Sequence, residues 1–192
     1  MTAQWQVPPL NAQIHTVSGI YPPETARRIV QGAVDAVKKP EVADMARRIV
    51  RDLVDENLSP FFAIMSEVQA VYNIAITKMR YTRDPHGVEL VYGAEYIVKQ
   101  WNQGKKWAED CDTYASLLMA FFLAIGRHAR VTIVSFTQGE PNRFEHVFVE
   151  VFVPADQKMM IPGRWVVVDP STGPHVRKMI SQIKHAQHFY PE

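Results

Sequence analysis

The segment from Asp112 to Ile125 constrains the fold of this chain more than any other, because it is apolar on nearly every side. A helix without a polar face cannot lie on a protein surface, so we expect this one to be buried. Gly126 follows it directly, and glycine commonly ends a helix in this way. The sequence therefore predicts a helix at the centre of the molecule, with other elements packed around it.

Three later segments have the composition of β-strands. Residues 130–136, 144–153 and 164–169 are rich in Val, Ile and Phe and are bounded by Gly, Pro and Asn. In the middle segment, the side chains on both faces are apolar, which predicts a central strand covered on both sides. His146 and Phe148 share one face of this strand, and we expect the buried helix to cover that face.

Amphipathic helices are predicted before the buried helix. Apolar residues recur at spacings of three and four in residues 24–37 and 42–54, and Ser59-Pro60 is a typical start for a third helix. Residues 1–23 are rich in Pro, Gln and Thr, and we interpret them as an extended arm. Because helices precede strands along the chain, we predict an α+β fold with the sheet packed on the buried helix.

Composition limits the class of protein. The chain has 192 residues, 47% of them apolar and 21% charged, which is typical of a single globular domain. The net charge of +1 provides no basic surface for nucleic acid, and no apolar run is long enough to span a membrane. A single cysteine forms no intrachain disulfide and the N-terminus has no signal-peptide pattern, so we expect a cytoplasmic protein.

The only cysteine, Cys111, lies at the predicted start of the buried helix. Unpaired N–H groups and the helix dipole favour the thiolate at such a position, and the N–H of the cysteine is placed to donate to an oxyanion. Asp110 and Asp112 act in the opposite direction, because neighbouring negative charge raises the pKa of a thiol. The alternative interpretation is a small buried cysteine without a chemical role.

Two further residues complete a chemical set with this cysteine. His146 lies within a predicted strand, and Asp169 closes the next strand. Each has an ordinary structural explanation alone, as a core histidine and as a residue that ends a strand. Together, a thiol, a base and an anion are the groups that nucleophilic acyl transfer requires. We therefore expect the Cys111 sulfur about 3 to 4 Å from one ring nitrogen of His146, with Asp169 on the other nitrogen.

Three stretches of the chain form a set of motifs. Residues 110–115 read Asp-Cys-Asp-Thr-Tyr-Ala, residues 146–151 read His-Val-Phe-Val-Glu-Val, and residues 165–171 read Trp-Val-Val-Val-Asp-Pro-Ser. They resemble the core motifs of the transglutaminase-like cysteine-protease superfamily, roughly Gly-Asp-Cys-Asp-Asp, His-x-Trp-x-Glu and Trp-x-x-x-Asp-Pro-Thr. Residues 81–89 also resemble the segment that precedes the cysteine in small bacterial and phage-encoded members. The resemblance covers about residues 60–176.

The resemblance implies a papain-like, transglutaminase-like core, in which the helix that carries the cysteine packs on an antiparallel sheet. It implies Cys111 as nucleophile, His146 as general base and then general acid, and Asp169 as the group that orients the imidazole. The implied activity is acyl transfer at an amide of a protein or peptide substrate through a thioester. Hydrolysis, as a peptidase or amidase, is preferred over transfer to an amine, and no cofactor or metal is required.

The implied organisation is a single domain over residues 1–192. Within it we distinguish a helical N-terminal extension over residues 1–57, a catalytic core over 58–176 and a C-terminal tail over 177–192. We expect the two helices of the extension to pack on the core without contributing to the catalytic residues. The sequence indicates no oligomeric state.

Two positions depart from the family pattern. Glu109 stands where the family usually has Gly, and Thr113 where it often has Asp. A long acidic side chain just before the nucleophile is expected to narrow the site or to repel acidic substrates. The alternative function is therefore a catalytically weak or inactive member that serves as an interaction or assembly module, for example in a phage particle.

Two questions stay open at the level of the sequence. His185 and His188, with His175 nearby, have a spacing that a zinc site could use, although a polar tail is the preferred interpretation. The second donor to the oxyanion is not fixed by the motifs. The candidates for that role are Tyr81, Gln100 and Asn102.

Overall fold

The structure is a computed structural model, and it describes residues 15–16, 22–53, 55, 57–84, 90–140 and 143–191. Most of the arm predicted over residues 1–23 lies outside these described residues. The helices are α1 (Pro22–Val37), α2 (Pro40–Val50), α3 (Pro60–Lys78), α4 (Ala94–Asn102), α5 (Cys111–Ala124) and α6 (Val176–Gln182). The strands are β1 (His15–Thr16), β2 (Met79–Tyr81), β3 (Leu90–Val91), β4 (Trp107–Glu109), β5 (Ala129–Ser135), β6 (His146–Val153), β7 (Arg164–Val168) and β8 (His185–Phe189).

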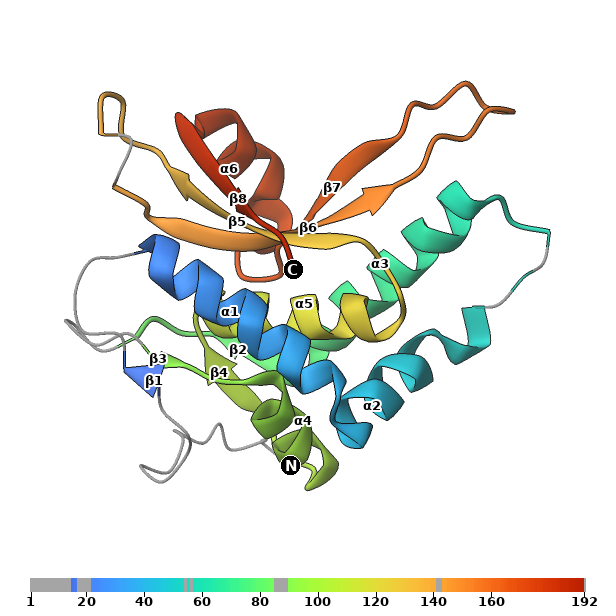
Figure 1. Ribbon diagram of the computed structural model, residues 1–192, viewed down its shortest axis with the longest axis horizontal. Coiled ribbons are helices and arrows are strands. Elements are labelled where there is room, and N and C mark those ends of the chain that lie inside the picture. The colour runs from blue at the N-terminus through green and yellow to red at the C-terminus, as the bar shows by residue number, and fades with distance from the viewer. Residues whose placement is uncertain are drawn as a thin grey trace.

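The main sheet has four strands in the order β7-β6-β5-β8, and all three neighbouring pairs are antiparallel. Two short pairs lie apart from it: β1 pairs antiparallel with β3, and β2 pairs parallel with β4. In Figure 1, α5 lies against one face of the sheet, with α1 to α4 around it, and α6 crosses the opposite face. The predicted α+β fold, with the cysteine-bearing helix packed on an antiparallel sheet, is confirmed.

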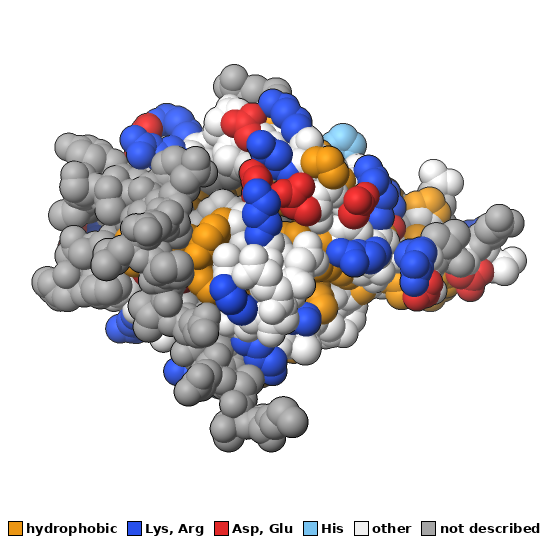
Figure 2. Space-filling model, turned by 90° about the horizontal axis from the view of Figure 1, so that it is seen from below, with side chains coloured by type: hydrophobic (Ala, Val, Ile, Leu, Met, Phe, Trp, Pro, Cys, Tyr) orange, Lys and Arg blue, Asp and Glu red, His pale blue; other side chains and the backbone are white. Residues whose placement is uncertain are grey.

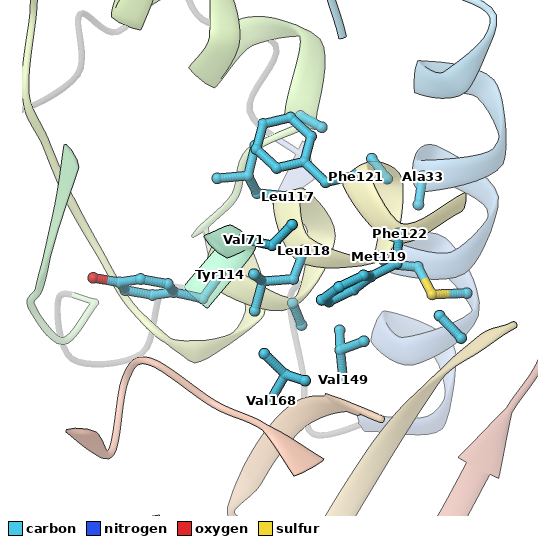
Figure 3. Packing of buried hydrophobic residues seen from close by; sticks show 14 of the residues in the cluster. Ala33, Val71, Tyr114, Leu117, Leu118, Met119, Phe121, Phe122, Val149 and Val168 are labelled. Carbon is cyan, nitrogen blue, oxygen red and sulfur yellow. The ribbon is translucent and has the colours of Figure 1, made fainter. Parts of the chain in front are cut away.

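The predicted central helix is buried along its length. Leu117, Met119 and Phe122 of α5 are fully buried in the main apolar cluster. In Figure 3, side chains of this helix lie next to Val149 and Val168 of the sheet. The helix ends as predicted, because Gly126 has a φ of 74°, which glycine adopts without strain.

One prediction about strand β6 is wrong. The face that packs on α5 carries Val147 and Val149, which lie in the main apolar cluster, whereas Phe148 packs with Met179 of α6. Alternation separates the two faces of a strand, but it cannot show which neighbour covers which face when both faces are apolar. His146 is the first residue of β6, so it reaches the site from the end of the strand.

The N-terminal helices form as predicted and pack on the core. Ala26 and Ala33 of α1 and Val42 and Ala46 of α2 are fully buried, and all four belong to the same apolar cluster as α5. Their charged residues lie outside, as in the ion pair between Arg28 and Glu24. In Figure 2, acidic and basic side chains lie side by side on the face seen from below.

The segment predicted as a C-terminal tail is instead part of the fold, since it contains α6 and β8. Strand β8 pairs with β5 from Val131–Phe189 to Ser135–His185. His185 and His188 therefore lie on a strand, where a spacing of three places side chains on opposite faces, so this spacing does not put both histidines on one face for a zinc site. Within the described residues, no helix combines the length and the apolar character needed to cross a membrane.

Candidate active site

Cys111 is the first residue of α5, and strand β4 places it there. Parallel pairing with β2 sets Glu109, the last residue of β4, opposite Tyr81. Asp110 then turns the chain from the strand into the helix as its N-cap, with extended backbone angles. Cys111 is half-buried. Its side chain therefore lies at the N-terminal end of a buried helix, near the end of β2.

His146 and Asp169 meet at the end of the main sheet. The distance from His146 Nε2 to the Oδ2 atom of Asp169 is 2.7 Å, so the predicted hydrogen bond between them is present. Both side chains are nearly enclosed, with 10% of His146 and 2% of Asp169 exposed. This bond leaves Nδ1 as the ring nitrogen of His146 that is available to the sulfur.

Asp169 is held as a carboxylate. Burial raises its pKa, but hydrogen bonds from His146, Ser171 and Thr172 outweigh burial and leave the pKa below its usual value. The Ser171 backbone N–H lies 3.1 Å from Oδ1, and the Thr172 hydroxyl lies 2.9 Å from Oδ2. We did not predict these donors, although the sequence Asp-Pro-Ser-Thr after a strand is typical of a turn in which Asp accepts from the residue two positions on.

The sulfur of Cys111 lies against the chain segment that carries His146. The backbone N–H of Val147, the next residue, lowers the pKa of the Cys111 thiol, so it lies near this sulfur. The structure therefore brings the start of α5, the start of β6 and the end of β7 to one place. The predicted distance of about 3 to 4 Å between the sulfur and the imidazole stays a prediction.

The surroundings of Cys111 strongly disfavour ionisation of its thiol. Burial raises the pKa of Cys111 well above its usual value, and the carboxylates of Asp110 and Asp112 raise it further. Oxygens of these two residues and of Asp84 lie within 4.8 Å of one another, close enough to hold a metal ion. Without a base that takes the proton during attack, this cysteine is expected to be inert at neutral pH.

Glu109 does not present a charge at the site, contrary to our expectation that it repels acidic substrates. Its side chain is 2% exposed, and burial together with Asp84 and Asp110 raises its pKa to about 8. Glu109 is therefore mostly protonated at pH 7. Trp107 acts in the opposite direction and lowers the pKa of Glu109, but it does not overcome burial.

The raised pKa of Glu109 makes stability depend on pH. Because the folded pKa of about 8 lies above the ordinary 4.5, this group stabilises the fold fully below pH 4.5 and progressively less up to pH 8. The difference corresponds to about 5 kcal/mol. Glu109→Gln, which stays neutral, is expected to remove most of the fall in unfolding free energy between pH 5 and pH 8.5.

Urea unfolding at several pH values measures this effect, with the exposed Glu140→Gln as a matched control that keeps the wild-type slope. Equal slopes for wild type and Glu109→Gln would show that Glu109 ionises normally in the folded protein.

Of the three candidates for a second oxyanion donor, Tyr81 is the best placed relative to Cys111. Burial raises the pKa of Tyr81 and Cys111 raises it further, so the phenol of Tyr81 lies near Cys111. Gln100 accepts a hydrogen bond from Lys105, 2.9 Å away, and Asn102 is exposed at the end of α4.

Glu150 is buried and hydrogen-bonded, as we expect for a carboxylate on a covered strand face. Its Oε2 lies 2.8 Å from Arg130 Nε and 2.6 Å from the Thr132 hydroxyl, and the Arg130 guanidinium lies 4.1 Å from the centre of the Trp165 ring. These residues face away from α5. They stabilise the sheet on the side opposite the cysteine-bearing helix.

A comparison with known protein families covers all three residues of this site. No curated protein matches the chain significantly. The family model of the transglutaminase-like superfamily matches residues 45–170, about two thirds of the chain, and this range includes Cys111, His146 and Asp169. The chain belongs to the transglutaminase-like superfamily.

Proposed function

We propose that this protein catalyses acyl transfer at an amide bond through a thioester on Cys111, with water as the usual acceptor. One observation supports this most: the buried hydrogen bond of 2.7 Å between His146 and Asp169. The thiol, the imidazole and the carboxylate come from three separate segments of the chain, and they are the groups that acyl transfer requires. A protein or peptide is the proposed substrate, and the reducing cytoplasm is the proposed location.

The first half of the reaction forms the thioester. Nδ1 of His146 takes the proton of Cys111 as the sulfur attacks the amide carbonyl, which gives a tetrahedral oxyanion. The backbone N–H of Cys111 and the hydroxyl of Tyr81 are the proposed donors to that oxyanion. The intermediate then collapses, the C–N bond breaks, and the leaving amine receives the proton from His146.

The second half releases the acyl group. His146 takes a proton from water, the hydroxide oxygen attacks the thioester carbonyl, and the sulfur leaves as the thiolate, which regains a proton from His146. Tyr81 is 41% exposed, so solvent reaches the edge of the site. This exposure lets water reach the thioester, as the proposed hydrolysis requires.

Asp169 acts through His146. Its carboxylate accepts from Nε2–H and thereby fixes the tautomer in which Nδ1 is free to take a proton. Its negative charge also stabilises the imidazolium that forms in each half of the reaction.

A second candidate function, a non-catalytic interaction module, is favoured by one specific observation. Burial and the carboxylates of Asp110 and Asp112 raise the pKa of Cys111, as in a cysteine without a chemical role.

Cys111→Ala distinguishes the two functions. We expect this variant to lose all hydrolysis of fluorescein-labelled casein and all incorporation of a fluorescent amine, while its melting temperature stays close to that of the wild type. Ser116→Ala, a buried substitution of similar size in the same helix, is the matched control and is expected to keep the activity. Activity that survives in Cys111→Ala contradicts the proposal, and a variant that fails to fold would show that Cys111 is structural.

A further inference from the structure

Strand β7 forms one edge of the main sheet, since the strand order β7-β6-β5-β8 gives it a single neighbour (Figure 1). Its backbone groups point alternately towards β6 and away from the sheet, as they do in any strand. Among the described residues, the groups that point away have no strand to pair with. A bare strand edge of this kind is a template for a further strand from another chain.

The register shows which residues of β7 have their backbone groups on this free edge. In β6, the N–H of Phe152 donates to the carbonyl of His128, on the side of β5, so the backbone groups of Val151 point to β7. Val151 lies opposite Val166, whose N–H and C=O therefore pair with β6. By alternation, the residues on either side of Val166 have their backbone groups on the free edge.

These two residues are Trp165 and Val167, and together they present two N–H and two C=O groups. Val166 and Val167 remain partly exposed, although they pack with the apolar clusters on opposite faces of the sheet. Val168, in the same strand, is only 2% exposed. Since both valines are covered from the faces of the sheet, their exposure comes from the open edge.

The two edges of the sheet differ in sequence. Proteins usually protect a free edge with charges, proline or a bulge. Strand β8, at the opposite edge, has the polar sequence His-Ala-Gln-His-Phe. Strand β7 reads Arg-Trp-Val-Val-Val, so only its first residue is charged, and its register with β6 is continuous over all five residues. The edge formed by β7 is therefore the one suited to pairing.

Strand β7 is followed directly by Asp169, whose carboxylate holds His146. A chain paired along β7 is thereby led past the end of the strand to the candidate active site. We propose that the free edge of β7 binds an extended segment of the protein substrate as an additional strand, and so positions its amide bond for Cys111. This inference rests on the proposed function, because it specifies how the substrate of that reaction is bound.

The start of α5 lies beside the end of β7. Burial raises the pKa of Tyr114 and Asp169 raises it further, so this tyrosine lies near Asp169. Tyr114 follows Cys111, the first residue of α5, by about one helical turn. Neighbouring strands lie about 4.8 Å apart, so a chain that continues past Val168 stays close to Asp169 and to the first turn of α5.

The size of the edge favours a transient substrate over a second copy of this chain. Strand β7 has five residues, about 17 Å of strand, and two of them present backbone groups. Four hydrogen bonds along so short an edge bury far less than the roughly 1,200 Å² that stable interfaces need. Pairing through the main chain requires an extended partner, so the proposed substrate is an unfolded or flexible segment.

The test removes one outward N–H. Val167 is exchanged for its α-hydroxy acid analogue by nonsense suppression, which converts the N–H into an ester oxygen and keeps the side chain. The matched control is the same exchange at Val166, whose N–H points to β6. Initial rates of hydrolysis of fluorescein-labelled casein, a protein without a stable fold, give KM and kcat for each variant.

We expect the ester at position 167 to raise KM about 2- to 10-fold, the range for one lost hydrogen bond, and to leave kcat within about twofold of the wild type. The ester at position 166 is expected to lower the melting temperature and to keep the wild-type KM. An unchanged KM for the position 167 ester overturns the proposal. Activity in Cys111→Ala tests the proposed function separately, so the two can fail independently.

A second measurement needs no turnover. In Cys111→Ala, amide hydrogen exchange of Val167 is expected to slow at least about 10-fold when casein is added, because the bound segment accepts from this N–H. The amide of Val151, which pairs within the sheet, is expected to be unchanged. Exchange of Val167 that casein does not slow would overturn the proposal. Protection that depends on the concentration of this protein alone would also overturn it, since a second copy would then occupy the edge.

Discussion

Asp169→Asn is expected to lower the acyl-transfer rate about 10³- to 10⁴-fold while the protein stays folded, by analogy with the loss of the orienting carboxylate in a serine-protease triad. His146, the hydroxyl and N–H of Ser171, and the hydroxyl of Thr172 all donate to Asp169. An asparagine at this position turns one oxygen into a donor, which conflicts with one of these partners and favours the wrong imidazole tautomer. It also removes the charge that stabilises the imidazolium.

Initial rates of amide hydrolysis, together with thermal melting, measure this effect. Asp156→Asn is the matched control, because Asp156 is also a buried aspartate that accepts from a hydroxyl, that of Ser59, and from a backbone N–H. We expect the control to lose stability and keep activity. Wild-type activity in Asp169→Asn would mean that this carboxylate does not take part in the reaction.

Deletion of residues 1–57 is expected to leave a chain that does not fold. The deletion removes α1 and α2, whose buried faces share one apolar cluster with α5. Phe121 and Phe122 of α5 are fully buried, and loss of these neighbours exposes part of that helix to water. We expect an aggregated product without a cooperative melting transition, so the helical segment is not a removable extension.

A milder variant tests the same point in the full chain. Ile29→Ala, at a position that is 1% exposed, is expected to lower the free energy of unfolding by about 2 to 5 kcal/mol. Arg28→Ala, on the outer face of the same helix, is the control and is expected to change it by less than about 0.5 kcal/mol. A soluble remainder that lacks residues 1–57 and melts cooperatively would contradict this account.

The sequence allowed the elements to be predicted where local pattern decides them. The buried helix before Gly126 and the strands near residues 130–136, 144–153 and 164–169 appear within a few residues of their predicted ends. Amphipathic spacing likewise predicted α1 and α2. In these segments, apolar composition and period both favour one type of element, so no knowledge of the neighbours is needed.

Prediction failed where a neighbour distant in sequence decides the outcome. Strand β8 has a polar composition and is held by backbone pairing with β5, which leaves no apolar alternation to detect. The charge state of Glu109 depends on burial and on Asp84, 25 residues earlier in the chain.

Predictions for the candidate site also succeeded where local sequence decides and failed where a neighbour decides. The types and order of Cys111, His146 and Asp169 were sufficient to predict the hydrogen bond between the last two. The face of β6 was predicted wrongly, because its valine face and its phenylalanine face are equally apolar. The donors Ser171 and Thr172 follow from turn chemistry that the sequence contains.

Coupling between Cys111 and His146 is the central claim, and the alkylation rate of the single cysteine tests it most directly. We compare iodoacetamide rates from pH 6 to pH 10 for wild type, His146→Gln and, as a control histidine in β8, His188→Ala. The account predicts that His146→Gln alkylates about 10- to 100-fold more slowly than the wild type near pH 7, and that His188→Ala is unchanged. The same slow rate in wild type and His146→Gln at every pH would contradict it, because Cys111 would then be a buried thiol without a base.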